Sequence, residues 1–417
     1  MLVKTILNRI HKFKSFVYKS VTWTGSAEAP QLEVEVVERA NGKPICSECR
    51  FPRPGYDRLP KRRFEFVPLW GIKVFLVYAP RRVSCPNCGV CVEFMPWAMG
   101  KRPLTKVYGW FLASWAKRLS WKETAEAFNT SWESVFRSVE MAVEWGRLYQ
   151  DLSDITSIGI DEIAWKKGHK YLTLVYQIDD HCKRLLWIGE NRRTRTLLRF
   201  FRWLGPDLSK ELEYICTDMW KPYLKVIAKK AGHAVHILDR FHIMSHFSKA
   251  LDEVRAGEAR ALKERGFEPV LTKTRWLLLK RPENLTGPQE IKLSELLQYN
   301  LKSVRGYLLK VEFQLFWDYV SPYWAGRFLD DWCTKAMRSK IDPLKKVAKM
   351  LRKHRSLLLN WFEARGKLSS GVVEGFNTKT KLTIRKAYGF RTYRGAEVAL
   401  YHSLGKLPEP DFTHRFC

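Results

Sequence analysis

The chain has 417 residues, 46% of them hydrophobic, which is enough to bury more than one ordinary core and excludes an intrinsically disordered protein. Its 73 basic residues outnumber its 43 acidic residues and give a formal net charge of +30, which favours a polyanionic partner such as nucleic acid. Charged residues interrupt every hydrophobic run before it reaches the roughly eighteen apolar residues of a membrane-spanning helix, so we expect a soluble chain without a membrane partner.

Five of the nine cysteines lie within residues 46–91, and four of them form two Cys-x-x-Cys pairs. Two thiolates separated by two residues can bind one tetrahedral Zn²⁺. The first twenty residues lack the continuous apolar core of a secretory signal, so an oxidising compartment that would favour disulfides is not indicated. The pattern therefore favours a structural zinc site over a disulfide framework, with buried, reduced cysteines as the alternative. Cys91 extends the second pair and competes for the fourth position, for which we favour Cys88. The predicted ligands are Cys46, Cys49, Cys85 and Cys88.

Strand-like runs at 64–66 and 74–78 separate the two pairs, which fits a zinc-ribbon-like module with a hairpin between its ligands. A short helical region follows it. The segments Ser120–Glu123 and Thr130–Glu133 both have the form of a capping box and predict two helix starts after a helix that contains Trp110. This pattern is typical of a helix-turn-helix, although any small three-helix bundle shares it. Arg137 is a candidate DNA contact in the last helix, with a solvated charge as the alternative.

The centre of the chain changes to alternating strand and helix patterns. Residues 157–165, 171–178 and 184–189 are β-rich and joined by turn residues, which predicts three sequential antiparallel strands. A helix at 194–204, an apolar run ending at Asp218, a further helix and a run ending at Asp239 come next. The predicted order is βββαβαβ.

This order, with Asp161 in the first strand and Asp218 just past the fourth, is the arrangement of ribonuclease H-like nucleic-acid enzymes. Mg²⁺ and Mn²⁺ take oxygen ligands, and two such ions about 3.5 to 4 Å apart can activate a water or a 3′-hydroxyl and stabilise the leaving oxygen in phosphoryl transfer. A third carboxylate is needed nearby. The best candidate is Glu374, in the helix-prone segment 369–379.

Four segments carry a family resemblance: GIDE at 159–162, TDMWKPY at 217–223, LDRFHI at 238–243 and VVEGFNTKTK at 372–381. They resemble the DDE transposases of bacterial insertion sequences, specifically the ISL-three group. The resemblance covers nearly the whole chain, because that family also has a cysteine region and a helix-turn-helix ahead of its catalytic core. It implies that the metal-binding triad is Asp161, Asp218 and Glu374 and that a D-x-x-H signature is formed by Asp239 and His242.

The triad residues also have ordinary structural alternatives. Asp161 could cap a turn, but an acidic residue in an apolar strand is unfavourable unless it is paired or binds a metal. Asp218 could cap the helix that follows it, and Glu374 could be a solvated helical charge. Glu162 points to the opposite face of a regular strand, which favours a surface or supporting position over ligation.

Three further residues are candidate accessory groups. Asn377 lies three residues after Glu374 on one helix face and could hydrogen-bond a ligand carboxylate or DNA, or be a surface amide. Asp239 and His242 are three residues apart on a presumed helix, where the histidine could order the active site or be purely structural.

The long separation of Asp218 and Glu374 predicts an insertion. Its pattern is mainly helical, and the aromatic-rich stretch at 313–324 is predicted to be mostly core, with stacking on unpaired DNA bases as the alternative. The expected domains are an N-terminal arm and zinc-binding module at 1–98, a helix-turn-helix DNA-binding region at 99–150, a ribonuclease H-like DDE catalytic core at 151–244 and 366–405, and a helical insertion domain at 245–365.

From Lys335 to Arg394 the chain carries 17 basic residues against 3 acidic ones. A positive surface beside a carboxylate triad suits an enzyme that cuts DNA, because phosphates must be attracted to a site whose own charge repels them until metals bind. Solvated helix faces explain part of this charge. The predicted DNA contacts are Arg137, Lys379, Lys381 and Arg385.

The sequence thus predicts an α/β protein: a ribonuclease H-like core interrupted by a helical insertion and preceded by a zinc-ribbon-like module and a helix-turn-helix. By resemblance it implies a transposase that binds the terminal inverted repeats of its insertion sequence and catalyses metal-dependent DNA strand cleavage and strand transfer. Mg²⁺ or Mn²⁺ in the active site and structural Zn²⁺ are the implied metals.

Double-stranded DNA, both as terminal repeats and as target, is the implied partner, and a homodimer or larger assembly on DNA is implied by analogy. The expected location is the nucleoid, in the cytoplasm of a bacterium or archaeon. The alternatives are a ribonuclease H-like DNA nuclease and a domesticated DNA-binding regulator without turnover.

Overall fold

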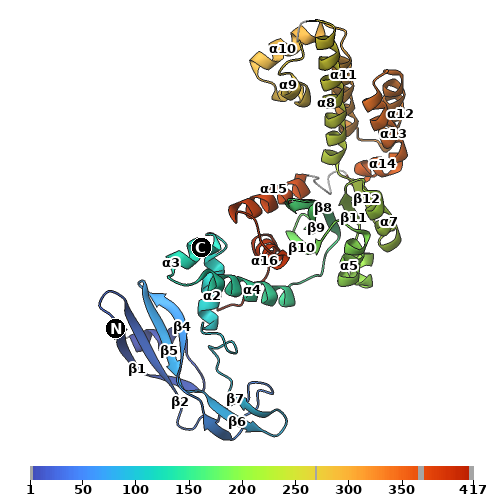
Figure 1. The fold of residues 1–417 in the computed structure, drawn as a ribbon. Helices are drawn as coiled ribbons and strands as arrows, with labels where there is room; N and C mark the ends of the chain where they lie inside the picture. The colour runs from blue at the N-terminus through green and yellow to red at the C-terminus, as the bar shows by residue number, and fades with distance from the viewer. Residues whose placement is uncertain (1–2, 268–269, 365–370, 413–417) are drawn as a thin grey trace. The chain divides into compact units, whose positions relative to one another are not determined.

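The computed structural model describes residues 3–267, 270–364 and 371–412. The chain forms two compact units, one of which joins the residues up to Asp151 to those from Lys386 onward, while the other comprises Leu152–Arg385. The fold is mixed α/β, as predicted, with two sheets in the first unit and a mixed sheet followed by helices in the second (Figure 1). Within the described residues, no helix has the length and apolar character needed to cross a membrane.

The first unit begins with a four-stranded sheet in the order β1-β2-β5-β4, in which β2 and β5 are parallel. Alternate side chains face a core centred on Trp97, whose ring packs against the rings of Phe16 and Tyr78. The predicted strands at 64–66 and 74–78 lie within β4 and β5. The elements are α1 (Val3–Ile10), β1 (Phe16–Gly25), β2 (Pro30–Glu38), β4 (Arg62–Leu69) and β5 (Ile72–Tyr78).

A small antiparallel sheet in the order β3-β6-β7 lies next in the first unit. Its support includes the buried carboxylate of Glu93, which accepts a hydrogen bond from the Tyr78 hydroxyl at 2.6 Å and pairs with Arg81 at 2.7 Å. The pair satisfies a charge that would otherwise be costly to bury. The strands are β3 (Gly55–Arg58), β6 (Arg81–Cys85) and β7 (Gly89–Val92).

Four helices complete the first unit: α2 (Lys106–Trp115), α3 (Trp121–Ala127), α4 (Trp132–Tyr149) and α16 (Tyr393–Leu404). The capping box that begins at Ser120 is confirmed. The box predicted at Thr130 is wrong by one residue, because the Thr130 amide still bonds back to α3 and Ser131 caps α4 instead. Helix α16 packs on α4, where Arg394 pairs with Glu140 at 2.9 Å.

The second unit is built on a five-stranded mixed sheet in the order β10-β9-β8-β11-β12. Strand β9 pairs antiparallel with both β8 and β10, whereas β11 and β12 run parallel to β8. The predicted order of strands is therefore found in this segment, with one helix, α6 (Pro206–Glu211), in addition to the predicted ones. The strands are β8 (Ser157–Lys166), β9 (Lys170–Ile178), β10 (Lys183–Glu190), β11 (Tyr214–Thr217) and β12 (Val235–Leu238).

Helices cover both faces of this sheet. Ile158 and Ile160 of β8 face a core with Phe200 and Tyr223, and this side is covered by α5 (Thr194–Leu204) and α7 (Lys221–Lys230), with the short α6 (Pro206–Glu211) between them in the chain. The alternate residue Gly159 contacts α15 (Gly371–Lys386) on the other side. Since side chains alternate along a strand, Asp161 points toward α15 and Glu162 toward α5 and α7.

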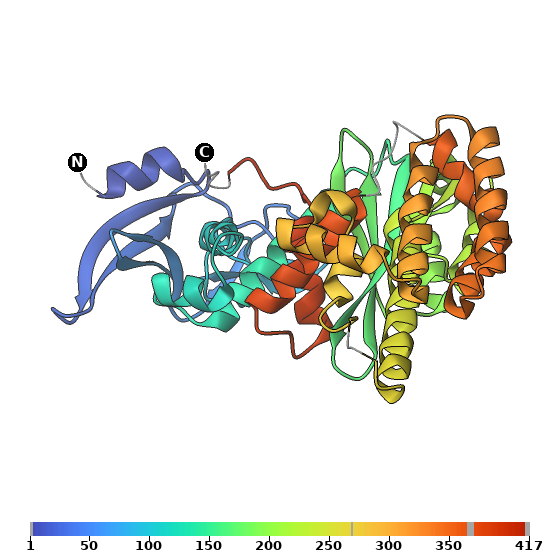
Figure 2. The ribbon, with the colours of Figure 1, turned by 90° about the horizontal axis from the view of Figure 1, so that it is seen from above.

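A layer of helices lies between β12 and α15 in the chain, and α8, α11 and α13 pack beside one another within it (Figures 1 and 2). Helix α8 begins directly after Asp239 and continues beyond residue 245, where the sequence predicted a domain boundary. The elements are α8 (Arg240–Glu264), α9 (Arg275–Leu279), the 3-10 helix η1 (Pro282–Asn284), α10 (Gly287–Leu297), α11 (Lys302–Gln314), the 3-10 helix η2 (Leu315–Asp318), α12 (Pro322–Arg338), α13 (Asp342–Lys353) and α14 (Arg355–Glu363).

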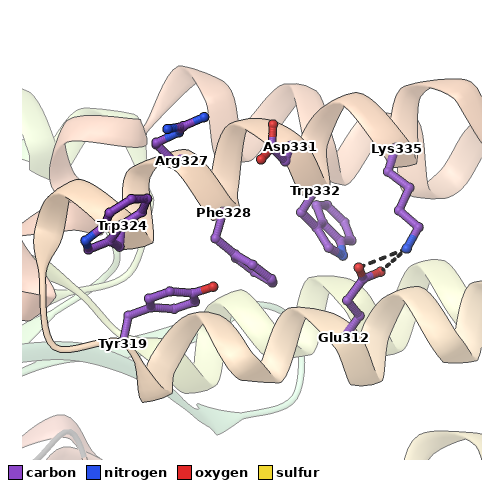
Figure 3. A pocket seen from close by; sticks show the side chains of 8 residues that line it. All are labelled: Glu312, Tyr319, Trp324, Arg327, Phe328, Asp331, Trp332 and Lys335. Atoms are coloured by element: carbon purple, nitrogen blue, oxygen red, sulfur yellow. Dashed lines mark hydrogen bonds and ion pairs between the residues drawn. The ribbon is translucent and has the colours of Figure 1, made fainter.

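The aromatic-rich stretch of this layer is only partly core. Phe313, Phe316 and Trp317 are buried, as predicted, but Tyr323 and Trp324 are exposed. A cavity of about 330 Å³ opens beside Trp324, between α11, η2 and α12 (Figure 3). It is lined by Glu312, Tyr319, Trp324, Arg327, Phe328, Asp331, Trp332 and Lys335.

Candidate active site and cysteine cluster

Three aspartates lie at one edge of the five-stranded sheet, because the register of its parallel strands aligns them. Cys216 of β11 is opposite Gly159 of β8, and Thr217 is opposite Leu238 of β12. Asp161 comes two residues after Gly159, Asp218 comes directly after Thr217, and Asp239 comes directly after Leu238. Three neighbouring strands therefore bring together the carboxylates of Asp161, which lies within β8 just past its pairing with β11, and of Asp218 and Asp239, which directly follow β11 and β12.

Asp161 is held by three groups and is only 7% exposed. One of its oxygens accepts a hydrogen bond from the backbone N–H of Glu162 at 2.7 Å and lies 3.5 Å from Nε2 of His242. The other accepts a hydrogen bond from the side-chain amide of Asn377. A carboxylate held on both oxygens has a fixed orientation, so its remaining lone pairs point in a defined direction.

The Asp239–His242 pair lies at the start of α8. Asp239 caps the helix by accepting a hydrogen bond from the backbone N–H of Phe241 at 2.8 Å, and its Oδ2 is 3.9 Å from Nε2 of His242. Burial raises the pKa of Asp239 to about 6. The interaction with Asp161 raises the pKa of His242 to about 9, so the imidazole is cationic at neutral pH and offsets part of the charge of the aspartates.

Helix α15 brings Glu374 to this edge. Gly159 of β8 leaves room for Val373, since a Cβ at position 159 would overlap Cγ2 of that valine. Phe376 stacks on Tyr176 with ring centroids 4.8 Å apart, and the Tyr176 hydroxyl donates to Oδ1 of Asn377 at 3.2 Å. Glu374 is exposed and lies close enough for its charge to raise the pKa of Asp239. Ser369 and Ser370, in the predicted segment, lie outside the described residues.

Asp218 is held from the side of the sheet that faces α7. Its Oδ1 accepts a hydrogen bond from the backbone N–H of Trp220 at 2.9 Å, and its Oδ2 accepts one from Nη2 of Arg192 at 2.7 Å. Nε of Arg192 lies 3.2 Å from Oε1 of Glu162. Glu162 does point away from Asp161, as predicted, but its side chain is only 6% exposed and therefore not at the surface.

Glu162, Asp218 and Arg192 influence one another's charge. Burial and the neighbouring Asp218 raise the pKa of Glu162 to about 8, while Arg192 opposes that rise. The guanidinium of Arg192 also lies over the ring of Trp220, 4.6 Å from its centroid. Two cations, His242 and Arg192, thus flank the carboxylates from opposite faces of the sheet.

The residue types suit a hard divalent cation, because Asp161 and Asp218 offer carboxylate oxygens from adjacent strands and Asp239 and Glu374 lie within electrostatic reach. Among the described residues, these carboxylates do not form a group of three or more whose ligand atoms all lie within 4.8 Å of one another, so they would have to move closer to share one ion. Mg²⁺ and Mn²⁺ prefer such oxygen donors.

The cysteine cluster lies in the first unit. The Sγ atoms of Cys46, Cys49, Cys85 and Cys88 all lie within 4.8 Å of one another, a set that can hold one metal ion. Tetrahedral zinc with bonds of about 2.3 Å keeps its sulfurs at comparable separations. Cys91 is also close, because β7 pairs with β6 and brings its Sγ to 3.3 Å from that of Cys46.

The predicted DNA contacts fall on two helices. Arg137 is on α4 in the first unit, where it pairs with Glu133 at 2.6 Å. Lys379, Lys381 and Arg385 are exposed on α15, after Glu374.

Three neighbours of the site were not predicted from the sequence: Arg192, Trp220 and Tyr176. One signal for Arg192 was available: β8 and β10 both run antiparallel to β9, so the turn after β10 leaves the sheet at the edge where β8 ends. Tyr176 could have been found from the same pairing, since it lies opposite Gly159. Trp220 gave no signal, because it acts here through its backbone N–H and its ring face.

The comparison to known proteins identifies the chain as a DDE transposase, an enzyme of DNA transposition. The family model of ISL3-type DDE transposases, described as transposase, matches residues 158–397. More narrowly, the chain belongs to the ISL3 family of insertion-sequence transposases. This match decides between the alternatives that the sequence left open in favour of a transposase.

Two relatives resemble the chain over most of its length. The transposase for insertion sequence element IS1001 of Bordetella parapertussis is 27% identical over 395 residues, which cover 94% of this chain and 96% of the relative. The transposase for insertion sequence element IS1557 of Mycobacterium tuberculosis is 28% identical over 371 residues, with 83% and 82% covered. The similarity therefore extends beyond the matched core into the N-terminal region.

Proposed function

We propose that Asp161, Asp218 and Glu374 hold the divalent ions with which this transposase cuts and joins DNA. The observation that carries the proposal is the alignment of Asp161 and Asp218 on adjacent parallel strands, with α15 docked against the same edge through Asn377. Asp239 adds a fourth carboxylate on the next strand. The mixed sheet and its carboxylate edge support a ribonuclease H-like core.

The reaction has two steps at one site: hydrolysis at an element end, which frees a 3′-hydroxyl, and attack of that hydroxyl on a phosphodiester of target DNA. When bound, Mg²⁺ or Mn²⁺ supplies activation of the attacking oxygen and stabilisation of the leaving oxygen. The side chains around the triad orient its carboxylates. Asn377 and His242 fix the carboxylate of Asp161, and Asp239 positions His242 at the start of α8. No side chain forms a covalent bond to DNA.

The first unit is proposed to bind the terminal inverted repeats. Its helices α2, α3 and α4 would form the helix-turn-helix, with Arg137 on the last helix, and the four cysteines Cys46, Cys49, Cys85 and Cys88 would hold structural Zn²⁺. Four thiolates leave no open position for a water, so this zinc has no catalytic part. Lys379, Lys381 and Arg385 extend α15 away from Glu374 and are proposed to contact DNA phosphates.

The proposed domains are those predicted from the sequence, with residues 1–98 and 99–150 for repeat binding, 151–244 and 366–405 for catalysis and 245–365 as the insertion. Joining two element ends to a target requires two copies of the site, so we propose a homodimer or larger assembly on DNA. The bacterial relatives favour action on the DNA of a bacterial or archaeal nucleoid.

The test is cleavage of a labelled duplex that carries the terminal repeat of the element, with Mg²⁺ or Mn²⁺, for the intact protein and for Asp161→Ala, Asp218→Ala and Glu374→Ala. Binding is scored in the same samples. We expect metal-dependent nicking at the repeat boundary that each substitution abolishes while binding persists. Nicking that survives any of the three substitutions would remove that residue from the triad.

A further inference from the structure

We propose that Arg192 is a positioning residue that holds the carboxylate of Asp218 in the orientation needed to bind a divalent ion, with Glu162 and Trp220 fixing Arg192 in turn. The inference rests on the proposed function, because it acts through Asp218. It assigns a task to three residues that the triad leaves unexplained.

Arg192 bridges two carboxylates that come from different strands. One arm of its guanidinium donates to Oδ2 of Asp218 at 2.7 Å, and Nε forms an ion pair with Oε1 of Glu162 at 3.2 Å that lacks hydrogen-bond geometry. The side chains of Glu162 and Asp218 are 6% and 15% exposed, and that of Arg192 is 33% exposed. The contacts are thus largely shielded from water. In such a shielded environment an ion pair is stronger than in water, and the loss of one partner is costly.

The chemistry of this position requires arginine. A guanidinium is planar, carries donors on several edges and stays charged at all relevant pH values, so it can face two carboxylates while its plane rests on a ring. Here the plane rests on Trp220, 4.6 Å from the ring centroid. A lysine ammonium would keep the charge but would lose the stacking and the second contact.

Trp220 ties the arrangement to Asp218 twice. Its backbone N–H donates to Oδ1 of Asp218 at 2.9 Å, and its ring carries the arginine that donates to Oδ2. Asp218 follows the last residue of β11 and is therefore not held by the sheet itself. These two contacts set its side-chain orientation, in the same way that Asn377 and the Glu162 amide set that of Asp161.

Glu162 is the anchor of this network. It points to the face of the sheet opposite Asp161, and its Oε1 lies 3.2 Å from Nε of Arg192. Arg192 therefore joins the neighbouring strand β8 and the end of β11 through one carboxyl group on each. Without Arg192, Oδ2 of Asp218 would lose the donor that orients it, and the carboxylate would be free to turn away from the edge where Asp161 lies.

The effect is measured first on metal binding, without DNA and without turnover. Residues that orient metal ligands typically change metal affinity or activity by about 10 to 100-fold. We expect Arg192→Ala to weaken Mn²⁺ binding to the DNA-free protein by this factor, as followed by the electron paramagnetic resonance signal of free Mn²⁺. Arg192→Lys should recover part of the loss, and Glu162→Gln should give a smaller loss, because the amide oxygen can still face the guanidinium.

Two further readouts separate positioning from a general structural role. The Mg²⁺ concentration for half-maximal cleavage should rise in the same order of variants, whereas binding of terminal-repeat DNA and the circular dichroism spectrum should not change. The matched control is Arg355→Ala. It removes an arginine that pairs with Asp330 through two nitrogens, joining α14 to α12 within the helical layer, and it should leave Mn²⁺ affinity unchanged.

Asp218→Ala serves as the reference. If it weakens Mn²⁺ binding and Arg192→Ala does not, the inference alone is overturned. If Arg192→Ala tightens Mn²⁺ binding, Arg192 competes with the metal for Asp218 and the inference is also overturned. If Asp218→Ala itself leaves Mn²⁺ affinity unchanged, the proposed metal site fails and the inference falls with it.

Discussion

The cysteine cluster and the carboxylate edge are both candidate metal centres, but they are built in opposite ways. Each cysteine pair is local in sequence, and two short segments bring the four thiols within 4.8 Å. The carboxylates come from positions as distant as Asp161 and Glu374, and only the strand register and the docking of α15 bring them together. We therefore expect a bound metal to stabilise the fold around the cysteine cluster. At the carboxylate edge, the metal-free carboxylates repel one another.

The largest expected effect separates activity from stability at the carboxylate edge. Asp161→Asn should reduce the cleavage rate by on the order of 10³-fold or more. The three carboxylates are proposed to act together, and removing one residue of such a set removes most of its catalytic effect. Thermal stability of the metal-free protein should fall only modestly, because the ion pair with His242 is lost while the amide oxygen can still accept the hydrogen bond from the Glu162 N–H. Activity assays and differential scanning calorimetry measure the two. A large loss of stability would mean that Asp161 is structural.

The cysteine cluster should show the reverse behaviour. Structural zinc in small modules contributes about 10 to 16 kcal/mol of binding free energy at neutral pH, so Cys49→Ser should cost the module its zinc and its fold. Zinc content by atomic absorption and repeat binding by gel shift should fall together. Cys91→Ser is the matched control and should keep the zinc; loss of zinc in that variant would make Cys91 the fourth ligand in place of Cys88.

The docking of α15 can be broken at a single atom. Gly159→Ala adds a Cβ that overlaps Cγ2 of Val373, and such overpacking typically destabilises a protein by about 1 to 3 kcal/mol. We expect cleavage to fall with stability, because Glu374 and Asn377 move with the helix. Val373→Ala in the same chain should restore part of both, as measured by chemical denaturation and repeat cleavage. Failure of this rescue would show that α15 docks by other contacts.

The smallest expected effect is a pH dependence that arises from a histidine at the carboxylate edge. The pKa of His242 is raised from 6.5 to about 9 by Asp161 and Asp239, so its charged form stabilises the metal-free fold. That contribution is fully present below pH 6.5 and is lost as the pH rises through about 9. The melting temperature of the metal-free protein should therefore decline between these values, and His242→Gln should flatten the decline. An unchanged slope would remove His242 from the carboxylate cluster.

The same contrast explains what could be predicted from the sequence. The cysteine cluster follows from a local spacing, and the strand order of the second unit follows from local β patterns and turns. The choice of Asp161 and Asp218 needed only that order, because strands that run parallel in one sheet end at the same edge.

What could not be predicted depends on contacts between side chains from distant elements. The strand directions place the turn after β10 near Asp161 and Asp218, but which side chain of that turn reaches Asp218 depends on the stacking of Arg192 on Trp220, which no pattern specifies. The burial of Glu162 follows from the cover of α5 and α7, which alternation along β8 does not specify. The cap of α4 is Ser131 and not Thr130 because the Thr130 N–H still bonds to the Ala125 carbonyl of α3, a contact between residues that the capping-box pattern does not include.

The most direct test of the account is the position of Mn²⁺ by anomalous scattering, in crystals of the protein bound to terminal-repeat DNA. We predict a peak that bridges Asp161 and Asp218 at coordination distances, with Glu374 completing the ligand set from α15. A peak bound by Asp161 and Asp239 without Asp218 or Glu374 would contradict the proposed triad.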